Sequence, residues 1–244
     1  MQRNLVICTD GTWNTPDQED RGRTVPSNVV KICRATAGAT KEGVPQLVYY
    51  DTGVGTGGKW DQIKGGLFGV GLSKNIKQAY GAIGREFQPE DKLFLFGFSR
   101  GAYTARSLSG LIGLCGIPDP NKGKIGDIVE NAFKIYRLNP KKDPDERERQ
   151  ARQHRADFSY QDNGKALDEV WFLGVWDTVG ALGVPFKFSN FFAQKKHEFH
   201  DTTLGAHIKH AYHAVAIDER RKPFLPTLWL EKNMNPGQKV EQLW

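Results

Sequence analysis

The hydrophobic residues of this chain gather in six short, nearly continuous runs. They span residues 5–8, 46–50, 92–98, 170–176, 211–217 and 240–244. A strand that lacks the apolar–polar alternation is buried on both faces, as in a parallel sheet covered by helices. The pattern therefore predicts six buried strands.

Helical patterns lie between these runs. Residues 74–87 repeat apolar side chains at helical spacing, residues 102–114 are apolar around much of the helix, and residues 128–136 are amphipathic. Asp143 and Pro144 are typical of the N-cap and first turn of a charged helix, on whose solvated face we place His154. The alternation of strands and helices predicts a three-layer α/β fold with a mostly parallel central sheet.

Length and cysteine usage narrow the class of protein. The 244 residues suit one domain over residues 1–244. The three cysteines form no Cys-x-x-Cys pair, so we expect neither a disulfide framework nor a metal site. The apolar runs are too short for a membrane span or a signal peptide. This favours a reduced, cytoplasmic compartment and leaves secretion without a signal peptide open.

The charge balance is mildly basic. The net charge of +6 suits an anionic partner, such as a membrane surface or an acidic substrate. The most charged stretch, KKDPDERERQARQHR, alternates both signs, which is typical of a solvated helix. No nucleic-acid-binding motif is present, and we expect no nucleic-acid partner.

The most informative residues follow the third apolar run. Gly97, Ser99 and Gly101 form a G-x-S-x-G motif between a predicted strand and a predicted helix, as a nucleophile elbow requires. In such a turn the serine hydroxyl projects over the sheet edge, and side chains two positions away on either side would clash. The amide of Arg100 is the expected first oxyanion donor.

Two further strand ends supply candidate partners for this serine. The first run ends in Thr9-Asp10-Gly11-Thr12, and the amide of Gly11 or Thr12 is the candidate second oxyanion donor. The fourth run ends at Asp177, later in the chain than the serine, which follows the order serine, acid, histidine. A carboxylate there would orient a histidine and stabilise its cation.

The strings CTDGTWN, YYDTGVGTG, FGFSRGAYTARSLSGLI, GVWDTVGALG and HAVAIDERRKPFLPTLW carry a resemblance to a known family. Together they resemble an α/β-hydrolase-like family that includes the catalytic domain of type VI secretion phospholipase effectors. The resemblance spans nearly the whole chain. It implies an α/β-hydrolase-like fold, Ser99 as nucleophile, Asp177 as acid, and an ester or phospholipid substrate without a cofactor.

The general base has two candidate sources. His213 follows Asp177 in the chain and belongs to a shared block, but it falls in a predicted strand, whereas triad histidines usually occupy a loop after the last strand. The resemblance places a Gly-x-His motif beyond a strand such as VEQLW, where this chain stops. We therefore expect a fold that lacks its C-terminal part, with the base either at His213 or beyond Trp244.

Other functions remain open from the sequence. One alternative is a catalytically incomplete fragment or binding module. A second is a nucleotide site, because Gly53 to Lys59 match part of a phosphate-binding loop, although Trp60 replaces the required serine or threonine. Residues 184–199 mix phenylalanines with lysines, which suits a helix packed by its rings or contact with an anionic membrane surface.

Overall fold

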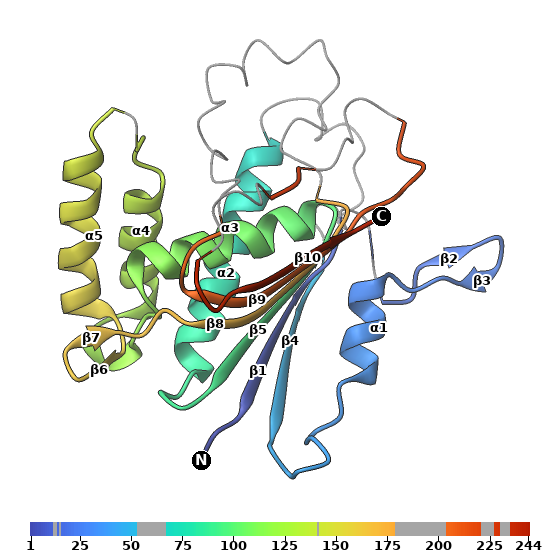
Figure 1. Cartoon of the computed structure of the whole chain (residues 1–244), viewed down its shortest axis with the longest axis horizontal. Helices are drawn as coiled ribbons and strands as arrows, with labels where there is room; N and C mark the ends of the chain where they lie inside the picture. The colour runs from blue at the N-terminus through green and yellow to red at the C-terminus, as the bar shows by residue number, and fades with distance from the viewer. Residues whose placement is uncertain are drawn as a thin grey trace.

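The computed structural model describes residues 1–11, 14, 16–52, 67–140, 142–178, 204–220, 227–229 and 235–244. Its centre is a six-stranded sheet in the order β10-β9-β8-β5-β1-β4 (Figure 1). The strands are β1 (Asn4–Thr9), β4 (Gln46–Asp51), β5 (Lys92–Phe98), β8 (Val170–Trp176), β9 (Ile208–Ala214) and β10 (Lys239–Leu243). Every neighbouring pair is parallel.

Helices cover both faces of this sheet, so the three-layer α/β prediction is confirmed. The main core lies between one face and α2 (Leu67–Glu86), α3 (Arg100–Cys115), α4 (Ile125–Tyr136) and α5 (Pro144–Phe158). On the other face α1 (Asn28–Ala35) packs over β1 and β5. Alternate residues of β1 divide between the two faces, because successive strand side chains point in opposite directions. Leu5 belongs to the main core, and Val6 packs toward α1.

The carboxyl ends of the strands meet at one edge of the sheet, which positions the candidate site. Thr9 pairs with Gly97 on one side and with Asp51 on the other. Phe98 pairs with Trp176 across β5 and β8. The residues that follow these strands therefore emerge side by side.

Several elements differ from the sequence-based expectations. Strand β9 begins at Ile208 and ends at Ala214, three residues earlier at each end than the predicted run. Helix α1 and two hairpins, β2–β3 (Glu19–Asp20 and Arg23–Thr24) and β6–β7 (Gln161–Asp162 and Lys165–Ala166), were not predicted. The second hairpin turns at Asn163-Gly164, which both have positive φ, and this dipeptide is a strong hairpin signal that could have located it.

Helix α5 begins as predicted, since Asp143 Oδ1 accepts a hydrogen bond from the amide of Glu146 and Pro144 follows in the first turn. The placement of His154 on a solvated face was wrong, because this side chain is only 1% exposed. Its ring lies 5.2 Å from the ring of Phe158, and neither ring nitrogen has a hydrogen-bond partner in the part of the chain that the structure describes. Burial lowers the pKa of His154 to about 4.

This burial predicts an acid-sensitive fold. The folded pKa of His154 lies below its ordinary value of 6.5, so protons bind the unfolded chain more strongly. Stability is full above pH 6.5 and is lost as the pH falls toward 4. Between pH 7 and 4.5 the free energy of unfolding should fall by about 2 kcal/mol less in His154→Leu than in the wild type. Urea denaturation at the two pH values measures both. Arg152→Leu, at an exposed site on the same helix, should not change this pH dependence. Equal acid sensitivity in all three proteins would contradict the prediction.

No helix in the described ranges is long and apolar enough to cross a membrane.

Candidate active site

Ser99 lies on a sharp turn between β5 and α3. It has φ 55° and ψ −115°, outside the regions that side-chain-bearing residues usually occupy. Its amide donates to the carbonyl oxygen of Trp176 at 2.9 Å, and its own carbonyl oxygen accepts from the amide of Tyr103 at 3.2 Å. The turn is thus fixed to the end of β8 and to the first turn of α3. Ser99 itself is partly exposed at the carboxyl edge of the sheet.

The two glycines of the motif are required by close backbone contacts. A Cβ on Gly97 would meet the carbonyl oxygen of Gly101 and lie 2.7 Å from the amide nitrogen of Ala102. A Cβ on Gly101 would meet the carbonyl oxygen of Thr9 and lie 2.6 Å from that of Asp10. The first turn of α3 therefore sits directly against the end of β1, and this contact sets the tight turn at Ser99.

Gly101→Ala should destabilise the protein by about 3 kcal/mol or more, because its methyl group would overlap backbone oxygens that cannot move independently. Chemical denaturation measures the change. Gly126→Ala is the matched control, because a Cβ there meets nothing within 4 Å and alanine favours the surrounding helix α4. The control should be more stable by up to about 1 kcal/mol. Two glycine variants of equal stability would contradict the packing argument.

Asp177 follows β8, the strand next to β5. Its Oδ1 accepts a hydrogen bond from the amide of Ala216 at 2.5 Å, and its own amide donates to the carbonyl oxygen of Ala214 at 2.9 Å. The end of β9 therefore holds this aspartate in place. Asp177 is partly exposed at the same sheet edge as Ser99.

Backbone strain points to the same two residues. In the described part of the chain, four residues other than glycine have positive φ. Arg21 and Asn163 lie in the turns of the two small hairpins. The other two are Ser99 and Asp177, with φ values of 55° and 43°. Such conformations cost about 1–3 kcal/mol and cluster at functional sites. Their occurrence at neighbouring strand ends supports a site there.

His213 lies one residue before the end of β9 and is 1% exposed. Its Nε2 accepts a hydrogen bond from the amide of Thr178 at 3.3 Å, and its ring meets Trp229 edge-on at 5.4 Å. Burial and the positive charge of Arg106 lower its pKa to about 4, partly offset by a hydrogen bond with Gln242. The His213 ring therefore lies beside Thr178, the residue that follows Asp177. Among the described residues, no hydrogen bond joins His213 to Ser99 or to the Asp177 carboxylate.

The structure describes two of the candidate oxyanion donors, the amides of Arg100 and Gly11. Arg100 is the first residue of α3, so its amide stands at the positive end of the helix dipole. Burial lowers the pKa of the Arg100 side chain to about 10. The amide of Gly11 donates to Asp10 Oδ1 at 2.7 Å, so in this conformation it is bonded to that carboxylate. Thr12 falls outside the described residues.

Sequence reasoning gave little weight to two carboxylates at this edge. Asp51 ends β4, and its buried Oδ2 has no hydrogen-bond partner within the described ranges. Burial raises the pKa of Asp51 to about 6, and the positive charge of Lys74 opposes the shift. Asp10 follows β1 and is 2% exposed. The signal for both was their position directly after an apolar run, the same signal that singled out Asp177.

Two expected features cannot be placed. The glycine-rich loop from Gly53 to Lys59 and the phenylalanine-rich stretch at 184–199 both lie outside the described residues. Within the part of the chain that is described, no group of three or more His, Cys, Asp or Glu side chains could hold a metal ion.

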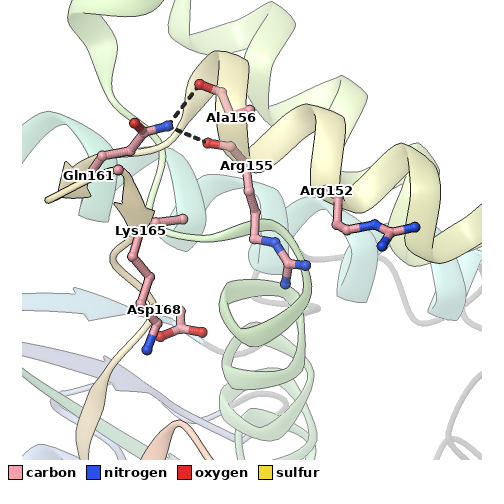
Figure 2. Close-up of a pocket in the computed structure, with 8 residues that line it drawn as sticks. Arg152, Arg155, Ala156, Gln161, Lys165 and Asp168 are labelled. Atoms are coloured by element: carbon pink, nitrogen blue, oxygen red, sulfur yellow. Dashed lines mark hydrogen bonds between the residues drawn. The ribbon is translucent and has the colours of Figure 1, made fainter.

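A separate cleft of about 260 Å³ lies between α5 and the β6–β7 hairpin (Figure 2). Arg152, Arg155, Lys165 and Asp168 contribute to its lining. Arg155 is paired with Glu148 at 2.8 Å. These lining residues come from the helix, the hairpin and the segment before β8, and none comes from the strand ends that carry Ser99 and Asp177. The cleft is therefore a different site from the candidate active site.

The parallel sheet and the serine turn place this chain in the class of α/β-hydrolase-like proteins. A family model described as the catalytic domain of the Tle1-like phospholipase effectors of the type VI secretion system matches residues 3–244. The chain belongs to this family of Tle1-like catalytic domains.

Similar proteins are longer than this chain. The uncharacterized protein YEL023C of Saccharomyces cerevisiae is 26% identical over 240 residues, which cover 91% of this chain and 32% of that protein. A structure of the Tle1 effector bound to the VgrG spike of the type 6 secretion system is 20% identical, with a TM-score of 0.45 over 92% of this chain and 46% of that one. An uncharacterized protein from Pseudomonas aeruginosa is 16% identical, with a TM-score of 0.46 over all of this chain and 40% of that one. The chain thus spans about a third of its curated relative.

Proposed function

We propose that this chain is a serine hydrolase that cleaves acyl esters, with phospholipids as the substrate class. The observation that carries the proposal is the strained turn at Ser99, between a buried parallel strand and a helix N-terminus. Membership of the Tle1-like catalytic domain family supports the lipid substrate. The elbow supports acyl transfer, because this geometry presents a hydroxyl beside main-chain amides.

In the proposed mechanism Ser99 Oγ attacks the ester carbonyl carbon while a histidine accepts its proton. The negative charge that develops on the carbonyl oxygen is stabilised by the amide of Arg100, by that of Gly11 or Thr12, and by the N-terminus of α3. The intermediate then expels the alcohol, which takes the proton from the histidine. Water hydrolyses the acyl-serine to release the fatty acid and restore the serine.

Asp177 is the proposed acid that orients this histidine. Its Oδ1 is held by the Ala216 amide, which fixes the carboxylate at the sheet edge. His213 is the candidate base inside the chain, and it would have to turn Nε2 away from the Thr178 amide to act. If His213 is the base, His213→Gln should lose as much activity as Ser99→Ala. A His213→Gln variant that keeps the wild-type rate assigns the base to another histidine.

The proposed substrate presents its ester at a membrane surface. The net charge of +6 would favour contact with an anionic bilayer, since anionic lipids attract basic surfaces. On this view the protein acts as a peripheral enzyme that needs no cofactor, because the serine mechanism uses protein groups and water alone.

A fluorophosphonate probe tests the function directly. The probe forms a covalent bond to an activated serine, and mass spectrometry of the digested protein identifies the labelled residue. We expect the label on the peptide that contains Ser99, together with release of fatty acid from phosphatidylglycerol vesicles. Labelling of several serines at equal rates, or none, would reject an activated nucleophile at Ser99.

A further inference from the structure

Cys8 and Cys33 face each other across the contact between β1 and α1. On β1, Val6 and Cys8 point toward α1, because successive strand side chains alternate between the two faces of the sheet. On α1, Cys33 lies one turn after Val29 and therefore shares its inward face. Val29 and Cys8 are both 0% exposed, and Cys33 packs against this cluster. The smaller core on this face of the sheet thus brings two thiols together.

The two thiols are in direct contact. A side-chain hydrogen bond between them is the largest influence on the pKa of each. This bond lowers the pKa of Cys33 from its ordinary value of 9.0, and burial opposes the shift. The same bond, burial and the negative charges of Cys33 and Asp10 raise the pKa of Cys8. Cys33 is therefore the thiol that loses its proton first, and the Cys8 thiol is the hydrogen-bond donor.

Exposure divides the two thiols in the same way. Cys33 is half-buried, so solvent reaches its side chain, whereas Cys8 is completely enclosed. A cysteine that reacts with oxidants needs thiolate character and access, and it goes on to form a disulfide when a second cysteine lies beside it. Cys33 meets the first two requirements, and Cys8 supplies the third.

We propose that Cys8 and Cys33 are a dithiol that a small peroxide oxidises to a disulfide between β1 and α1. A small oxidant suits a reactive thiol that is only partly open to solvent, and hydrogen peroxide is the probe. The disulfide joins the sheet to the helix that covers this face. The modification is separate from the hydrolase reaction, and its test needs no substrate.

The oxidation takes two balanced steps. The Cys33 thiolate attacks one oxygen of hydrogen peroxide, the O–O bond breaks, and the leaving hydroxide takes up the proton that Cys33 released. Cys33 is then a sulfenic acid. Cys8 Sγ attacks Cys33 Sγ, the S–O bond breaks, and the departing hydroxide leaves as water with the Cys8 proton. The two thiols lose two electrons in total, and one peroxide becomes two molecules of water.

The disulfide should stabilise the fold. It closes the chain between residues 8 and 33, which restricts the unfolded chain far more than the folded one. Helix α1 packs over β1 with Cα atoms of the two elements within 8 Å of each other, so a short approach of the helix allows the bond to form. A disulfide that closes a loop of this length should raise Tm by about 5 °C or more.

The experiment treats the intact protein with hydrogen peroxide, maps its peptides by mass spectrometry, and measures Tm before and after dithiothreitol is added. We expect a disulfide-linked pair of peptides that contain Cys8 and Cys33. Tm should lie about 5 °C or more above that of the reduced protein and return on reduction. Cys115 is the internal control, because it is buried and burial raises its pKa to about 12. Cys115 should react at least about tenfold more slowly than Cys33.

Two variants separate the roles of the cysteines. Cys8→Ala removes the resolving thiol, so oxidation of Cys33 should stop at the sulfenic acid, which dimedone traps. Cys33→Ala removes the reactive thiol, and Cys8 should then stay reduced because it is enclosed. The Cys33→Ala variant also controls for oxidation of the two methionines, since any change of Tm that peroxide causes in it cannot come from the disulfide. If Cys8→Ala does not fold, the linked peptides and Cys33→Ala test the pair without it.

Three results would overturn the proposal. The first is peroxide-treated wild-type protein in which Cys8 and Cys33 are not linked. The second is oxidation of Cys115 as fast as that of Cys33, which would show that the contact between the two thiols confers no reactivity. The third is a disulfide form whose Tm is equal to or below that of the reduced protein, after correction for the change in Cys33→Ala.

Discussion

Replacing Ser99 with alanine is expected to lower kcat for ester hydrolysis by about 10³-fold or more and to abolish fluorophosphonate labelling. Alanine has no hydroxyl to form the acyl-enzyme, and nothing else at the turn can take its place in the proposed mechanism. The fold should be retained, because alanine can adopt the same strained backbone at the same cost as serine. Activity is measured with p-nitrophenyl butyrate and Tm by circular dichroism.

Ser107→Ala is the matched control for this substitution. Ser107 lies on α3, the helix that Ser99 precedes, and is 1% exposed, and its Oγ has no hydrogen-bond partner among the described residues. Removing an unpaired buried hydroxyl should leave stability unchanged or slightly increased, and activity should remain at the wild-type level. If the Ser99 variant kept more than about a tenth of wild-type activity, Ser99 would not be the nucleophile.

Asp177→Asn is expected to reduce kcat by about 10²- to 10⁴-fold with little effect on Tm. An asparagine oxygen can still accept from the amide of Ala216, and asparagine tolerates positive φ well, so the end of β8 should keep its conformation. The variant lacks the negative charge that stabilises the histidine cation. The loss should therefore appear in kcat and in the labelling rate, with a smaller change in KM.

The control for this variant is Asp218→Asn. Asp218 is exposed and follows β9, the next strand in the sheet, so it offers a carboxylate near the same edge. The Asp218→Asn variant should retain the wild-type rate of ester hydrolysis. Activity lost in Asp218→Asn and kept in Asp177→Asn would move the acid of the triad from β8 to β9.

The strands and the serine turn could be predicted because their causes are local in sequence. Strand β5 has its predicted bounds at Lys92–Phe98 and lies inside the sheet, between β8 and β1, where a continuous apolar run is covered on both faces. The run of β4 lies at the edge of the sheet and is more exposed than predicted, with Leu47 37% and Val48 40% exposed. The glycines at 97 and 101 are a local signal in the sequence as part of the G-x-S-x-G motif. The contacts that require Gly97 are also local, whereas those that require Gly101 come from Thr9 and Asp10 at the end of β1.

The contacts of the histidines could not be predicted, because they depend on packing between distant elements. His154 belongs to a helix that is charged on most sides, and contacts of α5 with α3 and α4 decide that this one ring is buried. His213 faces Thr178 because of the register of β8 with β9, in which Val175 pairs with His213. Neither feature leaves a periodic signal in a single sequence.

The hydrogen bonds that described residues donate to Asp10 show the same limit. The position of Asp10 after a buried run could be seen in the sequence, but its partners come from α1 and β4 as well as its own loop. Helix α1 was not predicted. The hydrogen bond from Ser27 Oγ, at the N-cap of α1, to Asp10 Oδ2 could therefore not be predicted either.

The interior position of β1 has a consequence for how the protein is made. Among the six strands of the described sheet, β1 is synthesised first, yet it lies between β4 and β5. The ion pair between Arg3 and Asp91, which fastens the start of β1 beside β5, joins residues 88 apart in the chain. At ordinary rates of synthesis, on the order of 10 s pass between the emergence of β1 and that of β5. During synthesis β1 is therefore a hydrophobic segment without its neighbour, and a chaperone that binds it in that interval would protect the assembly of the serine turn.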